Sequence, residues 1–565
     1  MEGDSGSAVA NSQLPPGVAG IKKQYLKRVL PEQKDSQDGA PPRKKQRGQN
    51  KKRPRDRRVA SSERLCPSLK ISIPCPFSTD CRFSHDIDGY MAQKPADIGE
   101  RCVLFEQYGK CPYGLECRYG SKHISSDFKN IKRDDIKNPN STFSWLTKDL
   151  QDRLHKKAVA FPSSEKFLSK LQSAKDKASA SSDPATVDSE KVCSKVGPVS
   201  DEDIVKPRIA EKKMIDFRGK RYLAPLTTVG NLPFRRICKQ YGAEITCGEM
   251  SLCTNLLQGK QSEWALLKRH SSEDIFGVQL CGGFPDTMAR CAELINTHAS
   301  VDFIDINVGC PIDVIFKMGA GSALMNRHTR FESIVRGMVE VLDIPLTVKM
   351  RTGIYDKNWN AHKLLPKLHE WGVTMTTVHG RSREQRYTKL ADYDYLAQCA
   401  DVAAPMPLFG NGDVLSFEDY NTRMDTEKFA GVLIGRGALI KPWIFTEIKE
   451  QRHWDISSSE RLDMLRTFVD YGLEHWGSDM QGVDKTRRFL LEWLSFLYRY
   501  IPVGVLERVP QKINERPPAF VGRDDLETLM ASNHCDDWVK ISEMLLGPVQ
   551  DSFSFLPKHK ANSYQ

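Results

Sequence analysis

Eight short apolar runs, separated by longer amphipathic stretches, constrain the fold of this 565-residue chain more than any other feature. The runs are rich in β-branched residues and recur roughly every 22 to 43 residues between about 208 and 445. Because buried parallel strands are near-continuous apolar runs joined by helices, this pattern predicts an α/β fold. Eight units in about 240 residues fit a (β/α)₈ TIM barrel, and a six-unit doubly wound sheet is the alternative. The expected strands lie at 221–228, 244–250, 275–283, 303–311, 346–353, 374–381, 407–413 and 431–439.

The regions outside the barrel, which is expected over 208–450, differ in composition. Residues 1–60 contain 15 Lys/Arg against 6 Asp/Glu without apolar periodicity, which predicts a disordered basic arm. Cys, His and aromatic residues gather in 61–125, and a weakly helical segment with a Ser/Ala/Asp-rich flexible linker is expected over 126–207. Residues 451–550 carry apolar side chains at helical spacing, which predicts a helical domain before a tail at 551–565.

The charge of the chain is concentrated in its first 60 residues, which carry +9 of the total +11. Such arms favour polyanions, above all RNA or DNA. The run RKKQRGQNKKRPRDRR at 43–58 indicates a nuclear-import sequence or an RNA tether, or simply a solvated tail. No apolar run approaches 18 residues, so no membrane contact is expected. With no secretory leader, the 15 Cys indicate a reducing compartment, and we expect the nucleus and cytoplasm, with no obligate protein partner indicated.

Two clusters of cysteine and histidine share an unusual spacing. Each has three Cys separated by eight and then five residues, followed by a His, which is the donor set of a closed tetrahedral zinc site. A core this small needs the metal to fold, at roughly 10–16 kcal/mol of apparent binding free energy in comparable peptides. The expected ligands are Cys66, Cys75, Cys81 and His85 in the first cluster and Cys102, Cys111, Cys117 and His123 in the second.

Both clusters resemble CCCH zinc fingers, an RNA-binding family. The first has the family's usual last spacing, and the second is two residues longer before His123. The resemblance implies that single-stranded bases stack on aromatic side chains near the metal. The aromatic residues near the ligands are Phe77, Phe83, Tyr113 and Tyr119. They are candidates for this stacking role, for the small core of each finger, or for both.

Polar residues stand at the carboxyl ends of successive expected strands, where barrel enzymes hold their reacting groups. Buried polar groups there cost stability unless a polar ligand satisfies them, so together they indicate a site. Glycine-rich turns end the last two strands, and bare amides at this place can hold the phosphate of a cofactor such as flavin mononucleotide (FMN). The polar residues are Thr227, Gln279, Asn307, Cys310, Lys349, Arg351, His379, Arg381, Asn411, Asp413 and Arg436.

Several motifs resemble those of the tRNA-dihydrouridine synthases. They are LAPLTT, PFRRIC, DINVGCP, VKMRTG, VHGRSREQRY, NGD and IGRGAL, and they cover about 220–445. The helical region 451–550 is similar to the tRNA-binding domain of that family. With two fingers before the barrel, the chain resembles the eukaryotic branch that acts on uridine 47 of the variable loop. The resemblance implies bound FMN, NADPH or NADH as hydride donor, two structural zinc ions, and transfer RNA as substrate, with some messenger RNAs as further candidates.

The same resemblance implies roles for individual residues. Cys310 matches the catalytic cysteine, which gives a proton to carbon 5 of uracil after hydride has reached carbon 6. A thiol with a pKa near 8.5 is protonated at neutral pH yet acidic enough for this step. Asn307 and Arg381 are expected to hold the uracil. The matches to flavin contacts are Pro225, Leu226, Thr227, Gln279, Lys349, His379, Asn411, Gly412, Asp413, Gly435 and Arg436.

Two other readings of the chain remain at this point. An FMN barrel that reduces a free pyrimidine or an enone needs no fingers or basic arm, and an RNA-binding protein with an inactive barrel needs no Cys310. Cysteines in apolar surroundings are expected to be core residues; they are Cys238, Cys247, Cys253, Cys281, Cys291 and Cys399. In the helical domain, Trp493, Phe496 and Tyr500 are expected in the core, and Lys485, Arg487 and Arg488 on a solvated face or against RNA.

Overall fold

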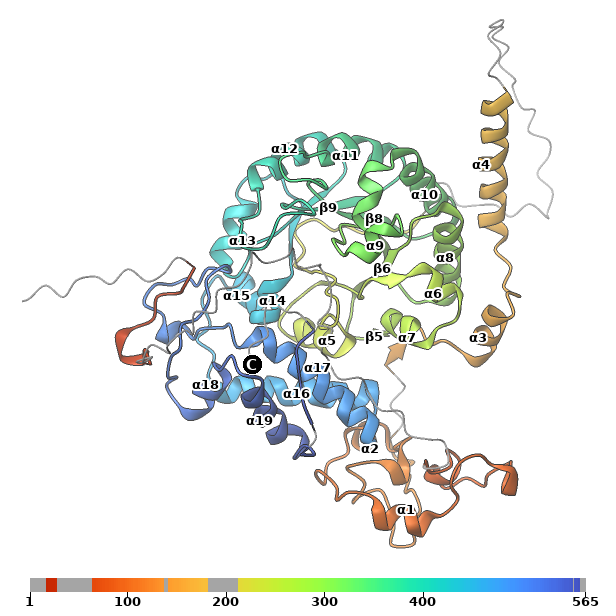
Figure 1. Ribbon diagram of the computed structural model, residues 1–565, viewed down its shortest axis with the longest axis vertical. Helices are drawn as coiled ribbons and strands as arrows, with labels where there is room; N and C mark the ends of the chain where they lie inside the picture. Colours follow the sequence, from red (N-terminus) through yellow and green to blue (C-terminus); the bar gives the residue numbers. More distant parts are fainter. Residues whose placement is uncertain (1–16, 28–63, 137–140, 181–211, 552, 559–565) are drawn as a thin grey trace, which may run out of the picture.

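The computed structural model describes residues 17–27, 64–136, 141–180, 212–551 and 553–558 (Figure 1). The basic run at 43–58 and most of the expected linker lie outside these residues. Among the helices of the described residues, none is both long and apolar enough to cross a membrane.

A closed barrel of parallel strands forms the centre of the molecule (Figure 1). Its strands are β2 (Tyr222–Leu223), β3 (Ile245–Cys247), β6 (Ile275–Cys281), β7 (Phe303–Val308), β8 (Leu346–Arg351), β9 (Met375–His379), β10 (Leu408–Asn411) and β11 (Gly431–Ile434). The ring closes because β2 pairs with both β3 and β11, and β3 also pairs with β6. Each expected run contains one strand, so the (β/α)₈ prediction is confirmed and the six-unit sheet is excluded.

Helices cover the outside of the barrel, as the amphipathic stretches between the runs predict (Figure 1). Asn231 caps the first of them and Pro233 lies in its first turn, while Ser416 and Asp419 form a capping box on another. The helices of the barrel region are α5 (Leu232–Gln240), α6 (Cys253–Leu257), α7 (Gln261–Trp264), α8 (Pro285–His298), α9 (Asp313–Lys317), α10 (His328–Val341), α11 (Ala361–Glu370), α12 (Tyr393–Ala403), α13 (Phe417–Met424), α14 (Arg436–Ile440) and α15 (Ile444–Glu450). Among them, α9 lies inside the ring of outer helices (Figure 1), and its Ile315 packs in one cluster with Cys310.

Aromatic side chains fill the amino-terminal end of the barrel. Phe303, the first residue of β7, meets Tyr222 edge to face at a ring-centroid distance of 6.1 Å, and Phe409 of β10 contacts the same tyrosine at 6.0 Å. Phe217 also meets Phe303 edge to face, at 5.5 Å between ring centroids. Because these rings occupy the amino-terminal end, we expect a ligand to bind at the carboxyl ends of the strands, where the polar residues lie.

A helical unit follows the barrel and shares a core with it. Its helices are α16 (Ser458–Trp476), α17 (Met480–Leu497), α18 (Asp525–Met530) and α19 (Cys535–Leu546). Trp493 of α17 packs on Phe234 of α5 at 5.2 Å between ring centroids and donates its indole N–H to the carbonyl of Leu439. The core role predicted for Trp493, Phe496 and Tyr500 is confirmed by their burial.

The expectation of a solvated or RNA-facing position is wrong for Arg487. Its guanidinium is buried and donates to Ser542 Oγ and to the carbonyl oxygens of Leu546 and Gly547. Those carbonyls lie at the end of α19, where a helix leaves its last acceptors without intrahelical partners. Arg487 therefore closes the end of one helix from the face of another.

Part of the expected disordered arm is ordered. Residues 17–27, with the 3₁₀ turn η1 (Lys23–Tyr25), lie against the loop between α17 and α18 through isolated β-bridges such as Ile21 with Leu506. Ala19 and Ile21 are fully buried in a small core with Ile501 and Val505. The expectation of disorder therefore does not hold for this segment.

The finger region lies beside the helical unit, and the segment after it runs along the barrel (Figure 1). Strand β1 (Thr142–Phe143) pairs antiparallel with β5 (Arg269–His270), and β4 (Ser251–Leu252) adds to β6. Helix α4 packs on α8 and α10, where Glu293 accepts hydrogen bonds from the backbone N–H groups of Ser163 and Ser164. The helices here are α1 (Ile87–Gln93), α2 (Val103–Tyr108), α3 (Lys148–His155) and α4 (Pro162–Ala180).

Candidate functional site

Cys310 lies just beyond the end of β7, at the open mouth of the barrel. Its side chain is 8 % exposed and packs among Cys281, Ile315 and Ala320. The backbone N–H of Cys310 donates to Asn307 Oδ1 at 2.8 Å, and its carbonyl accepts from Ser322 Oγ at 2.8 Å. Both backbone groups of Cys310 are therefore hydrogen-bonded, and its side chain is confined by these apolar neighbours.

Burial raises the pKa of the Cys310 thiol above its ordinary value. A hydrogen bond from the Ile312 backbone and the charges of Arg351 and Arg383 only partly offset this effect. Arg351 itself donates to the carbonyl of Gly309 at 2.8 Å, directly beside the cysteine. The thiol therefore stays protonated at neutral pH, and two guanidinium groups are near enough to stabilise the thiolate once the proton has left.

A line of hydrogen bonds orients Asn307. Thr347 Oγ1 and Gln279 Nε2 each donate to the carboxylate of Asp305 at 2.7 Å, and Asn307 Nδ2 donates to Gln279 Oε1 at 2.7 Å. Burial raises the pKa of Asp305 to about 6. Asp305 was not predicted, although it stands two residues before Asn307 and so on the same face of β7, which is the pattern that would have identified it.

Lys349 carries a cation into the barrel mouth. Its ammonium donates to Asn411 Oδ1 at 3.1 Å, and Asn411 Nδ2 donates in turn to the carbonyl of Leu433. Removal from water, together with the charge of Arg351, lowers the pKa of Lys349 to about 8. A desolvated cation held by a neutral amide favours an anionic or electron-rich ligand beside it.

Arg381 lies behind the site rather than in its opening. The guanidinium is fully buried, and one nitrogen donates to both oxygens of Asp413, at 2.7 and 2.6 Å, and to the carbonyl of Lys389. It also lies 3.3 Å from Nε2 of His379, whose pKa is lowered by burial and by nearby cations such as Arg351. Because its donors are used within the protein, the predicted contact of Arg381 with uracil has no support in this geometry.

The glycine-rich turns lie together at one side of the mouth. Gly412 has a φ of +141°, and a Cβ there would lie 2.6 Å from the Cβ of Ala391. Gly435 is the first residue before α14 and faces Leu226 of the turn after β2. Arg436 donates to Asp413 at 2.8 Å. Of the predicted residues after β2, Leu226 therefore lies next to the turn at Gly435, and Arg436 joins that turn to Asp413.

Residues that were not predicted complete the rim. Thr228 adopts a φ of +79°, which is strained for a β-branched residue, and its backbone N–H donates to the Glu249 carboxylate at 2.5 Å. Lys558, from the carboxyl-terminal segment, donates to Thr228 Oγ1 at 2.8 Å. Tyr387 stacks on His379 at 6.1 Å between ring centroids, with Arg436 over its ring. Since these contacts join distant parts of the chain, local sequence patterns do not reveal them.

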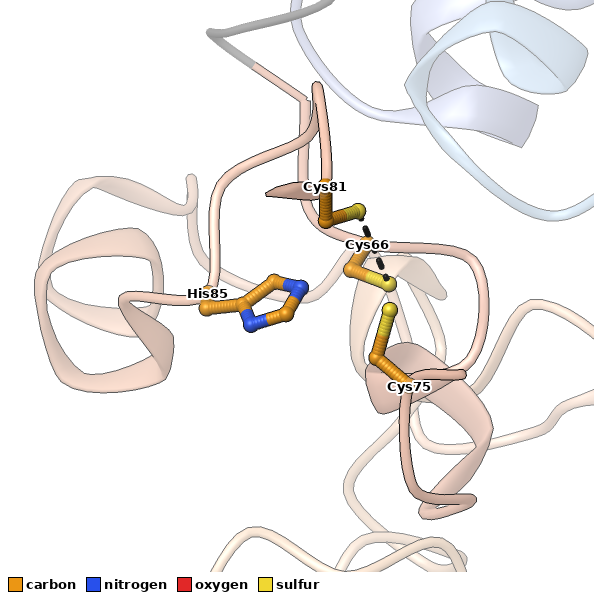
Figure 2. Close-up of side chains that lie close together, drawn as sticks. All are labelled: Cys66, Cys75, Cys81 and His85. Carbon is orange, nitrogen blue, oxygen red and sulfur yellow. Dashed lines mark hydrogen bonds between the residues drawn. The ribbon is translucent and has the colours of Figure 1, made fainter. Parts of the chain in front are cut away.

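The two metal-ligand sets fit zinc. In each set one ligand atom per residue can be chosen so that all four lie within 4.8 Å of one another. Two sulfurs bound tetrahedrally to one zinc at about 2.3 Å lie about 3.8 Å apart. Cys117 and Cys102 sulfurs are 3.8 Å apart, and those of Cys81 and Cys66 are 3.9 Å apart. Figure 2 shows the imidazole of His85 turned toward the three sulfurs of the first set.

His123 has the surroundings of a metal ligand despite its longer spacing. Its Nδ1 lies 3.2 Å from Asn130 Oδ1, while its buried Nε2 has no hydrogen-bond partner among the described residues. An Nδ1–H donated to Asn130 leaves the Nε2 lone pair for the metal, which is the usual way a second hydrogen bond orients a histidine ligand. Asn130 is itself fixed by donating to the carbonyl of Cys111.

Comparisons with known proteins match both the barrel and the finger region. The family described as "Dihydrouridine synthase (Dus)" matches residues 222–489, and the "DUS3L CCCH zinc finger domain" matches 62–93 and 94–126. A solved structure, "Crystal structure of TcOYE with pHBA", has a TM-score of 0.31 at 10% identity over 41% of this chain and 89% of that chain, and it is too distant to support an argument.

Relatives named tRNA-dihydrouridine(47) synthase [NAD(P)(+)]-like match nearly the whole chain. The protein from Xenopus tropicalis is 57% identical over 93% of this chain and 84% of its own length. The Homo sapiens protein is 57% identical over 92% and 85%, and the Arabidopsis thaliana protein is 42% identical over 99% and 94%. The family match, the identity of these relatives and the length they share lead to one conclusion: the chain belongs to the dihydrouridine synthase family.

Proposed function

We propose that this protein reduces uridine in transfer RNA to 5,6-dihydrouridine, with FMN at the mouth of the barrel and NADPH or NADH as the hydride donor. The observation that carries the proposal is the position of Cys310. Its thiol is fixed at the carboxyl end of β7, protonated by burial and next to two guanidinium groups. An acid held in this way can protonate an electron-rich carbon that develops beside it.

The residues at the mouth fit FMN. The amides of the turns at Gly412 and Gly435 would face its phosphate together with Arg436, while Gln279 and Lys349 would face the polar edge of its ring. The ammonium of Lys349 donates to the neutral amide oxygen of Asn411, and its positive charge suits a ring that gains negative charge. When bound, FMN supplies a hydride to carbon 6 of uracil after it has received one from NADPH or NADH.

The protein's own part in the reaction is the transfer of a proton. As the hydride reaches carbon 6, negative charge spreads from carbon 5 toward the carbonyl oxygen at carbon 4. The S–H bond of Cys310 then breaks and a C–H bond forms at carbon 5. The resulting thiolate lies near Arg351 and Arg383, and Asn307 keeps the Cys310 backbone in place during this change. The hydride and the proton together convert the double bond between carbons 5 and 6 of uracil into a single bond.

The proposal also covers the uridine position, the classes of RNA that are reduced and the location of the protein in the cell. The names of the relatives support uridine 47 of transfer RNA as the target, and the base must leave its stack to enter the mouth. Reduction of some messenger RNAs, and a location in both nucleus and cytoplasm, are supported by the basic run at 43–58, which lies outside the described residues.

The test compares Cys310→Ala with Cys281→Ala, a buried neighbour in the same apolar cluster. We expect Cys310→Ala to lower the rate of dihydrouridine formation about 10²–10⁴-fold while flavin content stays unchanged. Cys281→Ala should retain activity. The measurement is dihydrouridine by mass spectrometry in RNA treated with each purified protein. Unchanged product with Cys310→Ala would defeat the catalytic assignment, and comparable reduction of free uracil would favour a small-molecule reductase.

A further inference from the structure

The two zinc fingers differ in how deeply their ligands are buried. All four ligands of the second finger, residues 102–123, are buried, whereas three of those in the first finger, residues 66–85, are partly or fully exposed. Leu104, Phe105 and Tyr119 of the second finger belong to the same apolar core as α16 and α17. Tyr119 is 7 % exposed, so it cannot stack on a base unless this core opens.

Ser478, in the turn between α16 and α17, lies against the metal ligands of the second finger. Its hydroxyl oxygen is 3.1 Å from the sulfur of Cys117 and 3.6 Å from that of Cys111. Its carbonyl accepts the backbone N–H of Arg118 at 2.8 Å. A zinc-bound sulfur is a thiolate and can only accept, so with the metal bound the Ser478 hydroxyl is the donor.

The turn that holds Ser478 is shaped to receive the finger. Gly477 has a φ of +115°, and a Cβ at that position would lie 2.5 Å from the ring of Tyr113. The side chain of any other residue would therefore clash with the tyrosine ring, and its backbone would be strained at this φ. This close approach of the Gly477 backbone to the Tyr113 ring is expected at a fixed junction and not at a surface where one module moves freely on another.

Polar contacts continue the junction along α16 to the barrel. Arg101 donates to Asp470 at 2.8 Å, and Tyr108 Oη donates to Glu474 at 2.7 Å. The second oxygen of Glu474 accepts from Arg236 of α5 at 2.6 Å, and both charged side chains are largely buried. One carboxylate thus joins the finger, the helical unit and the barrel, and buried charged pairs of this kind are costly to break.

The first finger has a different setting. It meets the second finger through the Lys70–Glu116 ion pair at 2.9 Å, and the segment after that finger through a hydrogen bond from the Asn130 backbone to Ser72 Oγ. On its free side, Phe77 is 66 % exposed beside the ligand Cys75. An aromatic face open to solvent next to the metal can accept a base, which the buried aromatics of the second finger cannot do.

We propose that the second finger is a structural clasp and not an RNA reader. Its zinc, with Ser478 as a hydrogen-bond donor to the bound thiolates, fixes the finger to the turn between α16 and α17 and thereby stabilises the helical unit on the barrel. Contact with single-stranded RNA belongs to the first finger, a part of the inference that rests on the proposed function. The two zinc ions therefore have separate roles: one supports the catalytic body, and the other supports substrate binding.

A matched pair of ligand variants tests this division in the full chain with its flavin. Cys75→Ser removes a ligand of the first zinc, and Cys111→Ser removes the equivalent ligand of the second. We expect Cys75→Ser to weaken transfer RNA binding about tenfold or more with an unchanged melting temperature. Cys111→Ser should lower the melting temperature or prevent folding. Equal loss of RNA affinity in both variants, with equal melting temperatures, would overturn the proposal.

Ser478→Ala probes the clasp without touching a ligand. In a Cys75→Ser background, which leaves only the second zinc, we expect a chelator to remove the metal about 10–100-fold more readily from the Ser478→Ala protein. The matched control is Ser495→Ala, a buried serine of α17 whose hydroxyl donates to a carbonyl of its own helix. Zinc retention equal to that of the control would show that Ser478 does not support the metal.

These measurements are independent of dihydrouridine formation. If Cys310→Ala kept full activity, the catalytic role proposed for Cys310 would be wrong. Zinc retention and melting temperature would still test the structural role of the second finger. If Ser478→Ala behaved like its control, the clasp would fail while the reaction assigned to Cys310 stood. A loss of transfer RNA affinity in Cys111→Ser at an unchanged melting temperature would show that the second finger binds RNA.

Discussion

At the scale of single residues, Lys349 balances function against stability. Its pKa is lowered from 10.5 to about 8 because burial disfavours the charged form, with Arg351 adding to the effect. At pH 7 the lysine is still mostly charged, so the fold carries the cost of desolvating it. The unfolded chain binds more protons than the folded chain between about pH 8 and pH 10.5, and this cost therefore fades as the pH rises through that interval.

Lys349→Met should therefore stabilise the flavin-free protein and weaken flavin binding. We expect an increase of up to about 3 kcal/mol in the free energy of unfolding at pH 7, which shrinks toward zero near pH 10.5. Flavin content after purification should fall, because the cation near the ring is gone. Denaturant titrations of both flavin-free proteins at pH 7 and pH 10 check the stability. A variant that is less stable at pH 7 would contradict the burial cost assigned to Lys349.

At the scale of elements, the sequence predicts the barrel strands well, but it does not predict which arginine side chains are buried. Buried parallel strands are apolar along their length, so β7 and β8 could be placed from local pattern, and with them Asn307, Cys310 and Lys349 at their ends. The burial of Arg381 and Arg487 could not be predicted, because a single sequence does not reveal whether an arginine meets a buried carboxylate or carbonyl. The spacing of the zinc ligands, by contrast, is a local pattern, so the sequence alone predicts both ligand sets.

The amino-terminal segment 17–27 is the element that local pattern misses most clearly. It is too short for periodicity, and its partners lie about 480 residues away in the sequence, as the Ile21–Leu506 bridge illustrates. Its apolar residues nevertheless complete a small core with Ile501 and Val505. We therefore regard it as part of the helical unit and not of the basic arm.

Deletion of residues 1–27 should destabilise the helical unit. Removal of Ala19 and Ile21 exposes the apolar side chains that they cover, and we expect a loss of about 2–4 kcal/mol in the free energy of unfolding. Deletion of residues 1–16 alone is the control and should leave stability within about 0.5 kcal/mol. Thermal unfolding followed by circular dichroism distinguishes the two. Equal melting temperatures for both deletions would show that the segment does not contribute to the folded core.

At the scale of the whole molecule, the barrel and the helical unit share one apolar core, although composition divides them near residue 450. Helices α5 and α14 of the barrel share an apolar core with α16 and α17, and the second finger extends that core. The wall of the barrel next to the turn at Gly435 is thus packed from outside by α17. Flavin binding and helical structure should therefore be lost together when the protein unfolds.

Trp493→Ala tests this coupling at the centre of the shared core. The indole is fully buried between Phe234 and Phe468 and donates to the Leu439 carbonyl, so its removal should cost about 3–5 kcal/mol. Flavin release and loss of helical circular dichroism should shift to lower temperature by the same amount. Trp145→Ala, at an exposed tryptophan, is the control and should move neither. If the helical transition moved while flavin release did not, the two units would fold independently, and the barrel would hold its flavin without support from α17.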